Sequence, residues 1–274
     1  MSTQPRAFAP DPSDAPRQPS ILSKYAADFV SSYTAGSLCT PFIATLDRAV
    51  TENASGRNTL FNSATSTFAD IVRHPVKFLR GPMFRWVLSV YGTTYFVNNL
   101  FDSYKEHYKT DVAFEKWIGS SAVNSTASMF KDKAFASLYG VATNTAPVPV
   151  ASYVAWGARD LISMAFFVSL PPLVGKEIAK YTGNERSGYY VAQFMMPLVL
   201  QFLTSPIHLI GFDLYNNPNN TPAQRVAFLK KDYMKNVTTR MLRMMVPWSI
   251  GSIGNKELRT VLHSSLTPAP VKAL

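Results

Sequence analysis

The sequence is poor in cysteine and in charged residues, and each shortage excludes a class of protein. Cys39 is the single cysteine among 274 residues, so an internal disulfide and a thiolate metal cluster are both excluded. The four histidines show neither HExxH nor HxH spacing, and we expect no metal site. Charged residues make up 16% of the chain, against ~25% in soluble domains. This composition points away from an ordinary soluble protein.

Acidic residues and catalytic motifs are also scarce. The chain has 17 Asp and Glu against 27 Lys and Arg, for a net charge of +10. Such a charge suits nucleic acid or an anionic membrane, but no basic cluster is interleaved with aromatic residues as in RNA-binding modules. We therefore expect a membrane partner and no nucleic acid. No nucleophile–base pair and no glycine-rich phosphate loop is visible, so we expect no enzymatic activity and no cofactor other than a bound lipid.

The first 20 residues hold five prolines and no apolar run. A signal peptide needs an apolar core, and a mitochondrial presequence needs an amphipathic basic helix that prolines and acids interrupt. We expect residues 1–24 to form an extended tail that has no core of its own. A shorter tail is expected over residues 266–274.

Long stretches between these tails contain no charged residue, and several approach the ~20 residues that cross a bilayer. They cover residues 29–46, 86–101, 117–130, 134–158, 161–175, 187–212 and 244–255. Ser, Thr, Asn and Tyr are spread through them, as expected for helices with one face toward lipid and the other toward a watery cavity. A soluble helical protein with a large core is the alternative, although its helices would show a charged face on every turn. We predict an all-α membrane protein.

The charges between these stretches alternate by side. The connections 47–85, 131–133 and 213–243 carry 14 Lys and Arg, whereas 102–116 and 176–186 carry 6. Six transmembrane helices with their odd connections on the positive side would produce this distribution. Both termini would then lie on the opposite side.

Three segments share one design, a helix rich in small and polar residues followed by a basic connection and a second helix. Their anchors lie at Pro41, Thr126 and Pro206. The motifs are Phe78-Leu79-Arg80-Gly81, Arg159-Asp160, and Arg240 and Arg243 followed by Pro247.

On these motifs the sequence resembles the mitochondrial carrier family. The resemblance implies six transmembrane helices in three pseudo-symmetric two-helix repeats within residues 25–265, at about 25–110, 111–182 and 187–265. It also implies a multi-pass protein of the mitochondrial inner membrane that binds inner-membrane lipids such as cardiolipin.

The chain departs from that family at the gate. Of the six positions that carry gate charges in carriers, only Lys131 is charged here, and Ile43, Leu46, Ser128, His208 and Gly211 fill the others. We expect Lys131 to find no carboxylate opposite it, because Asp47 and Asp132 lie nearby in sequence but one or two turns out of register. Lys131, Lys133 and His208 then form only a gate remnant, and a rewired gate is the alternative. His208 has two interpretations, as a packing residue hydrogen-bonded across helices or as a proton-linked group.

Candidate substrate contacts are the ionisable residues inside the predicted membrane helices, which are costly there and usually functional. Arg159 and Arg243 form the proposed anion-binding pair because guanidinium groups suit carboxylate or phosphate. The alternative is that Asp160 or a neighbouring helix neutralises Arg159 and the pair only locks the bundle. Asp160, Arg240 and Arg85 are further candidates, and the competing interpretation of Arg85, which lies nearer the basic end, is that it snorkels to the membrane surface.

Pro41 and Pro206 are predicted helix kinks. Gly81 after Arg80 leaves open amides at a helix start, a place for a lipid phosphate such as that of cardiolipin.

Two functions remain open at this stage. The first is a degenerate carrier that has become a non-transporting, structural accessory subunit of a large inner-membrane complex of the respiratory-chain type, in contact with other membrane subunits. The second is a working solute carrier that exchanges a small anionic metabolite across the inner membrane through Arg159 and Arg243.

Overall fold

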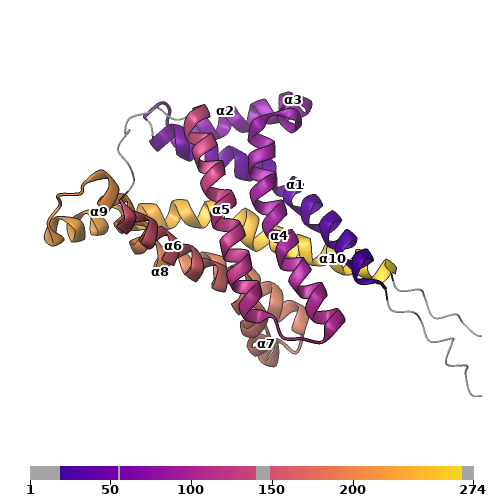
Figure 1. Cartoon of the computed structure of the whole chain (residues 1–274). Coiled ribbons are helices and arrows are strands. Elements are labelled where there is room, and N and C mark those ends of the chain that lie inside the picture. Colours follow the sequence, from indigo (N-terminus) through magenta and orange to yellow (C-terminus); the bar gives the residue numbers. More distant parts are fainter. Residues whose placement is uncertain (1–18, 55, 140–148, 267–274) are drawn as a thin grey trace, which may run out of the picture.

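The computed structural model describes residues 19–54, 56–139 and 149–266, and in these ranges it contains helices and no strand (Figure 1). The all-α prediction is thus confirmed for this part of the chain. The predicted tails lie mostly outside it, and helix is already present from Ile21 onward. The helices are α1 (Ile21–Ala54), α2 (Leu60–Arg73), α3 (Pro75–Arg80), α4 (Pro82–Tyr108), α5 (Ala113–Tyr139), α6 (Val150–Met164), α7 (Leu170–Thr182), α8 (Glu185–Asn216), α9 (Pro222–Met244) and α10 (Ser252–Leu266).

Two π-helical segments join helices end to end. η2 (Ala165–Ser169) connects α6 with α7, and η3 (Met245–Gly251) connects α9 with α10. Each segment lies in the middle of one long rod, and π-helical turns within α-helices are frequent at functional sites. Pro247 lies inside η3, where its missing N–H favours a departure from regular α-helical bonding.

Local sequence signals explain where several helices begin and end. Thr59 caps α2, and Asn184 caps α8 by accepting a hydrogen bond from the Ser187 amide at 3.0 Å. Thr221 and Gln224 form a capping box at the start of α9. Gly183, at φ +67°, ends α7 in the left-handed region that glycine adopts without strain.

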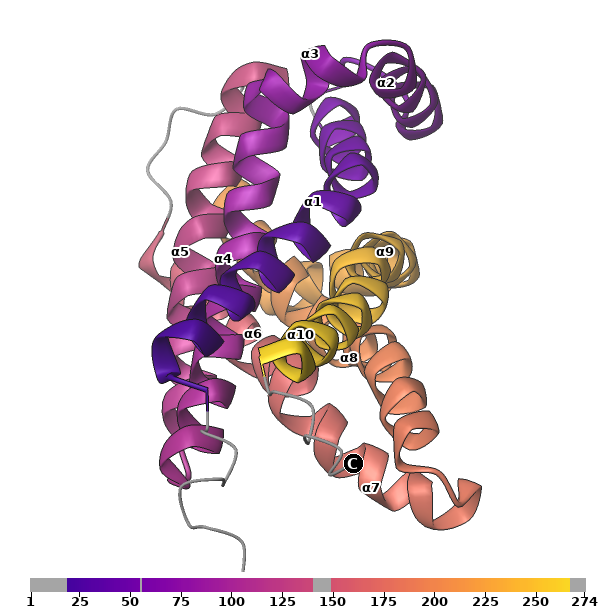
Figure 2. The ribbon, with the colours of Figure 1, turned by 90° about the vertical axis from the view of Figure 1, so that its right-hand side faces the viewer.

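The helices lie in two groups that meet along the middle of the molecule. α1, α4 and α5 lie side by side, with α2 and α3 at one end of this group (Figure 2). The second group contains α6, η2, α7, α8, α9, η3 and α10, and α10 also packs against α1. α1 and α4 approach closely where a Cβ on Gly36 would lie 3.2 Å from the Gly92 Cα. Small residues permit such close contact of backbones in membrane helices.

α1 has an inverted polarity compared with a helix of a soluble protein. Its exposed side chains include Phe29, Leu38 and Phe42, whereas Ser32 and Thr40 are fully buried. Soluble helices turn their apolar face to the core and their polar face to water. Exposed large apolar side chains together with buried hydroxyl groups are expected of a helix that has lipid on one side, while small apolar residues and Ile43 share the buried face of α1 with the hydroxyl groups.

Length and composition of the described helices can be compared with the six transmembrane helices predicted from the sequence. Within the described residues, two helical stretches are long and apolar enough to cross a membrane, Val150–Thr182 and Glu185–Asn216. The six transmembrane helices and the carrier repeat are not confirmed, because the inward Ser, Thr and Asn of the other long helices lower their mean hydropathy. Pro41 lies inside α1 and Pro206 inside α8, and both helices continue through them.

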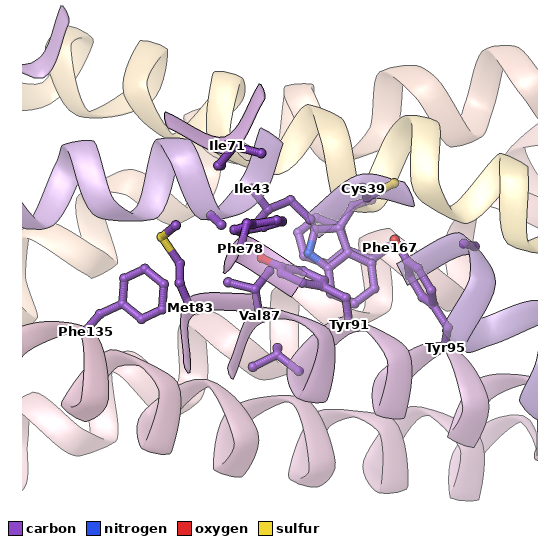
Figure 3. Packing of buried hydrophobic residues seen from close by; sticks show 14 of the residues in the cluster. Cys39, Ile43, Ile71, Phe78, Met83, Val87, Tyr91, Tyr95, Phe135 and Phe167 are labelled. Atoms are coloured by element: carbon purple, nitrogen blue, oxygen red, sulfur yellow. The ribbon is translucent and has the colours of Figure 1, made fainter. Parts of the chain in front are cut away.

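The apolar core joins the two groups. Figure 3 shows Phe135 and Met83 at one end of the cluster and Tyr91, Tyr95 and Phe167 at the other. The aromatic end contacts the polar chamber described next.

Candidate functional site

A cavity of about 240 Å³ opens where the two helix groups meet near the α4–α5 and α7–α8 turns. We call it the chamber. α4, α5, η2, α7, α8, η3 and α10 all contribute to its walls. Its lining residues are Tyr95, Asn98, Asn99, Asp102, Glu106, Lys116, Phe167, Val168, Pro172, Tyr189, Gln193, Trp248, Ser252, Asn255, Lys256 and Arg259.

The floor of the chamber is aromatic and lies at the two π-helical segments. Phe167 of η2 stacks on Trp248 of η3 with ring centroids 4.5 Å apart and planes 14° from parallel. Gln193 of α8 ties these segments together, because its Nε2 donates to the Phe167 carbonyl at 3.2 Å and to the Trp248 carbonyl at 2.7 Å. Tyr95 donates its hydroxyl to the Pro247 carbonyl. Stacked aromatic rings therefore close the chamber at this end, and hydrogen bonds from Gln193 and Tyr95 to the backbone of η2 and η3 hold them in place.

Primary amides form the middle of the chamber wall. Asn99 and Asn255 bond reciprocally, each Nδ2 lying 3.0 Å from the other's Oδ1. Asn98 accepts a hydrogen bond at 2.7 Å from Ser120 of α5. Buried amides of this kind are neutral and offer donors and acceptors side by side. They can accommodate another amide-like group without charge compensation.

The rim of the chamber carries both signs of charge. Lys116 pairs with Asp102 at 2.6 Å, and Arg259 makes two bonds of 3.0 Å to Glu106. Lys256 instead lies over the ring of Tyr189, with Nζ 3.2 Å from the centroid. Within the described residues no carboxylate lies within ion-pair distance of Lys256. The rim thus has one positive charge more than its carboxylates balance.

A buried carboxylate stands directly behind this rim. Asp28 of α1 is 0% exposed and receives hydrogen bonds from Arg259 at 2.9 Å, His263 at 2.8 Å and Ser103 at 2.5 Å. We call Asp28, Ser103, Glu106, Arg259 and His263 the Asp28 network. It joins α1, α4 and α10 at the chamber end of the molecule.

A second ionic cluster lies at the other end of α1. Asp47, 2% exposed, pairs with Lys131 of α5 and Arg243 of α9, both at 2.5 Å. Asp132 lies 2.8 Å from Lys131 and 3.6 Å from Arg243. We call these four residues the Asp47 network. The expectation that Lys131 lacks an opposing carboxylate is wrong, because α1 and α5 meet in a register that brings Asp47 to it.

The predicted substrate residues lie outside the chamber lining. Arg159 is held by Asp160 at 2.6 Å and by His208 Nδ1 at 2.6 Å, and Arg243 belongs to the Asp47 network. Arg240 donates to the Gln201 side chain at 2.9 Å. This arrangement agrees with the alternative in which Asp160 neutralises Arg159.

The remaining predicted residues are distributed along the molecule. Arg85 is exposed beside a surface hollow next to Trp86. Lys133 is exposed on α5 and takes part in none of the ion pairs of the Asp47 network. Arg80 ends α3, and Gly81 starts α4 without a side-chain cap. Gly81 lines a separate hollow of about 370 Å³ together with Arg48, His74 and Lys77.

Sequence inspection missed the chamber, although a periodic signal was present. In α10, Asn255, Arg259 and His263 recur every four residues and therefore share one helix face. They lie at the end of a charge-free stretch, where charges are easily taken for the start of a connection. Asp28, the partner of Arg259 and His263, directly precedes the first such stretch.

The comparisons with known proteins place the chain in a different family from the one expected. A family model described as "Probable citrulline exporter" matches residues 31–263. No match was found among the curated proteins or the solved structures. The match covers α2 to α9 completely and all but the ends of α1 and α10, so both ionic networks except Asp28 lie within it.

This match corrects two expectations. The resemblance to the mitochondrial carrier family is wrong, since no model of that family matches and the charges of its motifs at Arg159 and Arg243 are held in ion pairs. The accessory-subunit hypothesis is also wrong, because the matching family is one of transporters and not of structural subunits or enzymes. The transport alternative fits better, and the chain is a membrane protein.

Proposed function

The chain belongs to the probable citrulline exporter family, and from this membership we propose that it carries citrulline, or an amino acid of the same chemistry, through the chamber. One observation carries the proposal: neutral amides form the middle of the chamber and charges of both signs form its rim. Citrulline has a carboxylate, an ammonium group and an uncharged ureido side chain. Each of these groups has a counterpart among the lining residues.

The charged rim suits the amino-acid end of the substrate. Lys116, Lys256 and Arg259 face two carboxylates, Asp102 and Glu106. Asp28 behind the rim balances the charge of the lining residues as a whole, but Lys256 itself has no ion pair within the described residues and is the group that can bind the substrate carboxylate. Asp102 or Glu106 can exchange a lysine or arginine partner for the ammonium group. Such exchanges are cheap at a rim where water screens the charges.

The amide wall suits the ureido end. A ureido group offers N–H donors and a carbonyl acceptor, as Asn99 and Asn255 offer to each other. It can take the place of Asn99 at Asn255 and make the same two hydrogen bonds there, while Asn99 keeps its bonds to Ser31 and Ser32. A guanidinium or ammonium side chain would bring an uncompensated charge among neutral amides, which costs several kcal/mol unless it is paired. We therefore expect citrulline to be preferred over arginine and ornithine.

Exchange in proteoliposomes tests the function. The purified full-length protein is reconstituted, loaded with unlabelled citrulline and supplied with radiolabelled citrulline outside. We expect saturable exchange, with arginine and ornithine competing at least tenfold more weakly. Asn255→Ala should raise the KM for citrulline about tenfold, since one lost hydrogen bond in a buried site is worth about 1–1.5 kcal/mol. Asn219→Ala, on an exposed loop, is the matched control.

Absence of citrulline exchange by a folded protein would overturn the proposal. Exchange of arginine or ornithine in preference to citrulline would contradict the role of the amide wall. The membrane is tested separately by fractionation of cells that express a tagged chain. Co-sedimentation with inner-membrane markers of mitochondria would support the location expected from the sequence, and co-sedimentation with markers of another membrane would contradict it.

A bound anionic lipid such as cardiolipin is a further part of the proposal. The hollow at Gly81 carries three basic side chains and one carboxylate, Asp70, at the N-terminus of α4, which has no side-chain cap. The buried Thr67 hydroxyl that lines it has no hydrogen-bond partner among the described residues. A phosphate would satisfy this hydroxyl and the open amides of α4. Mass spectrometry of the protein purified in mild detergent should detect such a lipid, with Lys77→Ala reducing its occupancy.

A further inference from the structure

A second cavity, of about 650 Å³, lies on the outer side of the chamber wall, and we call it the outer groove. α7, α8 and α10 form it. Its lining residues are Pro172, Gly175, Lys176, Glu185, Arg186, Tyr189, Tyr190, Lys256, Glu257, Thr260 and Val261.

The outer groove and the chamber share Pro172, Tyr189 and Lys256. The shared wall is the pair in which the Lys256 ammonium lies over the Tyr189 ring. Tyr189 donates its hydroxyl to Gln193 at 3.1 Å, and Gln193 bonds both π-helical segments of the chamber floor. At this point the Lys256–Tyr189 contact separates the chamber from the outer groove. Tyr189 is also linked to the floor of the chamber through its hydrogen bond to Gln193.

The groove repeats the charge pattern of the chamber rim. Arg186 pairs with Glu257, and Tyr190 donates to the same carboxylate at 2.5 Å. Lys176 and Glu185 add one further charge of each sign. A zwitterion thus finds both an acid and a base here, as it does in the chamber, but it finds no side-chain amide among the lining residues.

Resting on the proposed function, we propose that the outer groove is a second, outer binding site for the same zwitterionic amino acid and that Lys256 transfers its carboxylate into the chamber. Lysine is suited to this step because its charge is a point at the end of a flexible stem. A carboxylate that approaches from the groove replaces the Tyr189 ring as the partner of Lys256. The ammonium can then turn to the chamber side with the carboxylate bound.

The two sites would recognise different ends of the substrate. The groove binds only the carboxylate and α-ammonium groups, because its lining has charges and aromatic rings. The chamber binds the ureido group through Asn99 and Asn255. We therefore expect the groove to bind other amino acids through their carboxylate and α-ammonium groups, ornithine included, and the chamber to reject ornithine because of its charged side chain.

Binding stoichiometry in detergent tests the outer site. Radiolabelled citrulline is titrated onto the purified full-length protein, and we expect two molecules per chain. Arg186→Gln, which alters the groove and leaves the chamber lining intact, should reduce this to one. Lys180→Gln, on the exposed face of α7, is the matched control and should retain two. One molecule per chain in the unmodified protein would overturn the proposal.

Exchange kinetics test the transfer residue. Lys256→Gln should raise the KM for citrulline at least tenfold, and Lys256→Arg should restore most of it because the charge is kept. Tyr189→Leu removes the competing ring, whose contact at an exposed site is worth about 0.5–1 kcal/mol, and should lower the KM about two- to fivefold. Melting temperatures of all variants establish that they are folded.

The outcomes distinguish this inference from the function on which it rests. If the unmodified protein exchanges citrulline and Lys256→Gln has an unchanged KM, the transfer role is wrong and the function stands. If the unmodified protein exchanges no citrulline, the function itself is wrong. If Lys256→Gln does not fold, a Tyr189→Leu variant with an unchanged or higher KM overturns the transfer role independently.

Discussion

The two buried aspartates of α1 have similar partners but opposite surroundings. Asp28 and Asp47 each receive two basic side chains from other helices. They lie about 28 Å apart along the helix axis, at a rise of 1.5 Å per residue. Two members of the Asp28 network, Glu106 and Arg259, also line the chamber. No member of the Asp47 network does so.

The aromatic floor separates these two ends. Along the rod of α9, η3 and α10, Arg243 precedes Trp248 and Arg259 follows it. The Asp28 network therefore has the chamber on its own side of the floor, whereas the Asp47 network lies beyond Trp248 and Phe167. An ion pair next to a polar cavity can separate at low cost when water enters, and an ion pair in a dry setting cannot. We infer that the structure is open at the Asp28 end and locked at the Asp47 end.

Asp47→Asn should have the largest effect, because it removes the carboxylate that holds both Lys131 and Arg243. Losing one partner of a buried ion pair costs about 3–5 kcal/mol, since the other charges stay buried without compensation. We expect a large fall in melting temperature in detergent. The measurement is thermal unfolding of the purified protein followed by tryptophan fluorescence.

The matched control for this variant is Asp132→Asn in the same network. Asp132 is 60% exposed, so water screens its contribution, and we expect a loss below about 1 kcal/mol. Equal losses of unfolding free energy for Asp47→Asn and Asp132→Asn would show that water reaches the Asp47 network. The proposed difference between the Asp47 end and the Asp28 end would then be wrong.

Asp28→Asn should cost less than Asp47→Asn, although Asp28 is the more deeply buried of the two. Arg259 keeps its two bonds to Glu106, so the substitution leaves only the hydrogen bonds at Asp28 weakened. Hydrogen bonds to charged groups are worth about 1.5–3 kcal/mol, and we expect a loss in this range. Thermal unfolding and citrulline exchange are measured together, with Glu106→Gln as the companion variant. A loss larger than that of Asp47→Asn would invert the comparison.

The fold class could be predicted from the sequence, because the charge-free stretches and the absence of strand alternation are local properties. The Asp47 network could not be predicted in the same way. Asp47 and Lys131 are 84 residues apart, and their contact depends on the crossing of α1 and α5. Counting positions from Pro41 therefore gave Ile43 and Leu46 as the gate positions, although Asp47 makes the ion pair.

The chamber was missed for a related physical reason. Its amide side chains come from α4, α8 and α10, and each helix contributes one or two amides that a single sequence shows as isolated polar residues. Arginines inside charge-free stretches attract attention, but here Arg159 and Arg243 are neutralised by Asp160 and Asp47. A charged residue in a predicted membrane helix indicates that it has a polar partner. Only the three-dimensional structure shows whether that partner is another side chain of the protein or a group in a cavity.

Apart from the control variants, the smallest effect on stability is expected at the floor that separates the two ends. Phe167→Leu keeps an apolar side chain and removes the stacking on Trp248, which is worth about 0.5–1.5 kcal/mol. The partition should become thinner without unfolding the rods, because Gln193 bonds the carbonyl groups of Phe167 and Trp248 and not their rings. We expect a lowering of the melting temperature by a few degrees and a slow leak of loaded citrulline from proteoliposomes that lack an exchange partner outside. Phe130→Leu, at a position that is 60% exposed on α5, is the control and should show no leak. If proteoliposomes with Phe167→Leu leak no citrulline, the Asp47 network alone closes its end of the protein. The aromatic floor would then contribute to packing only.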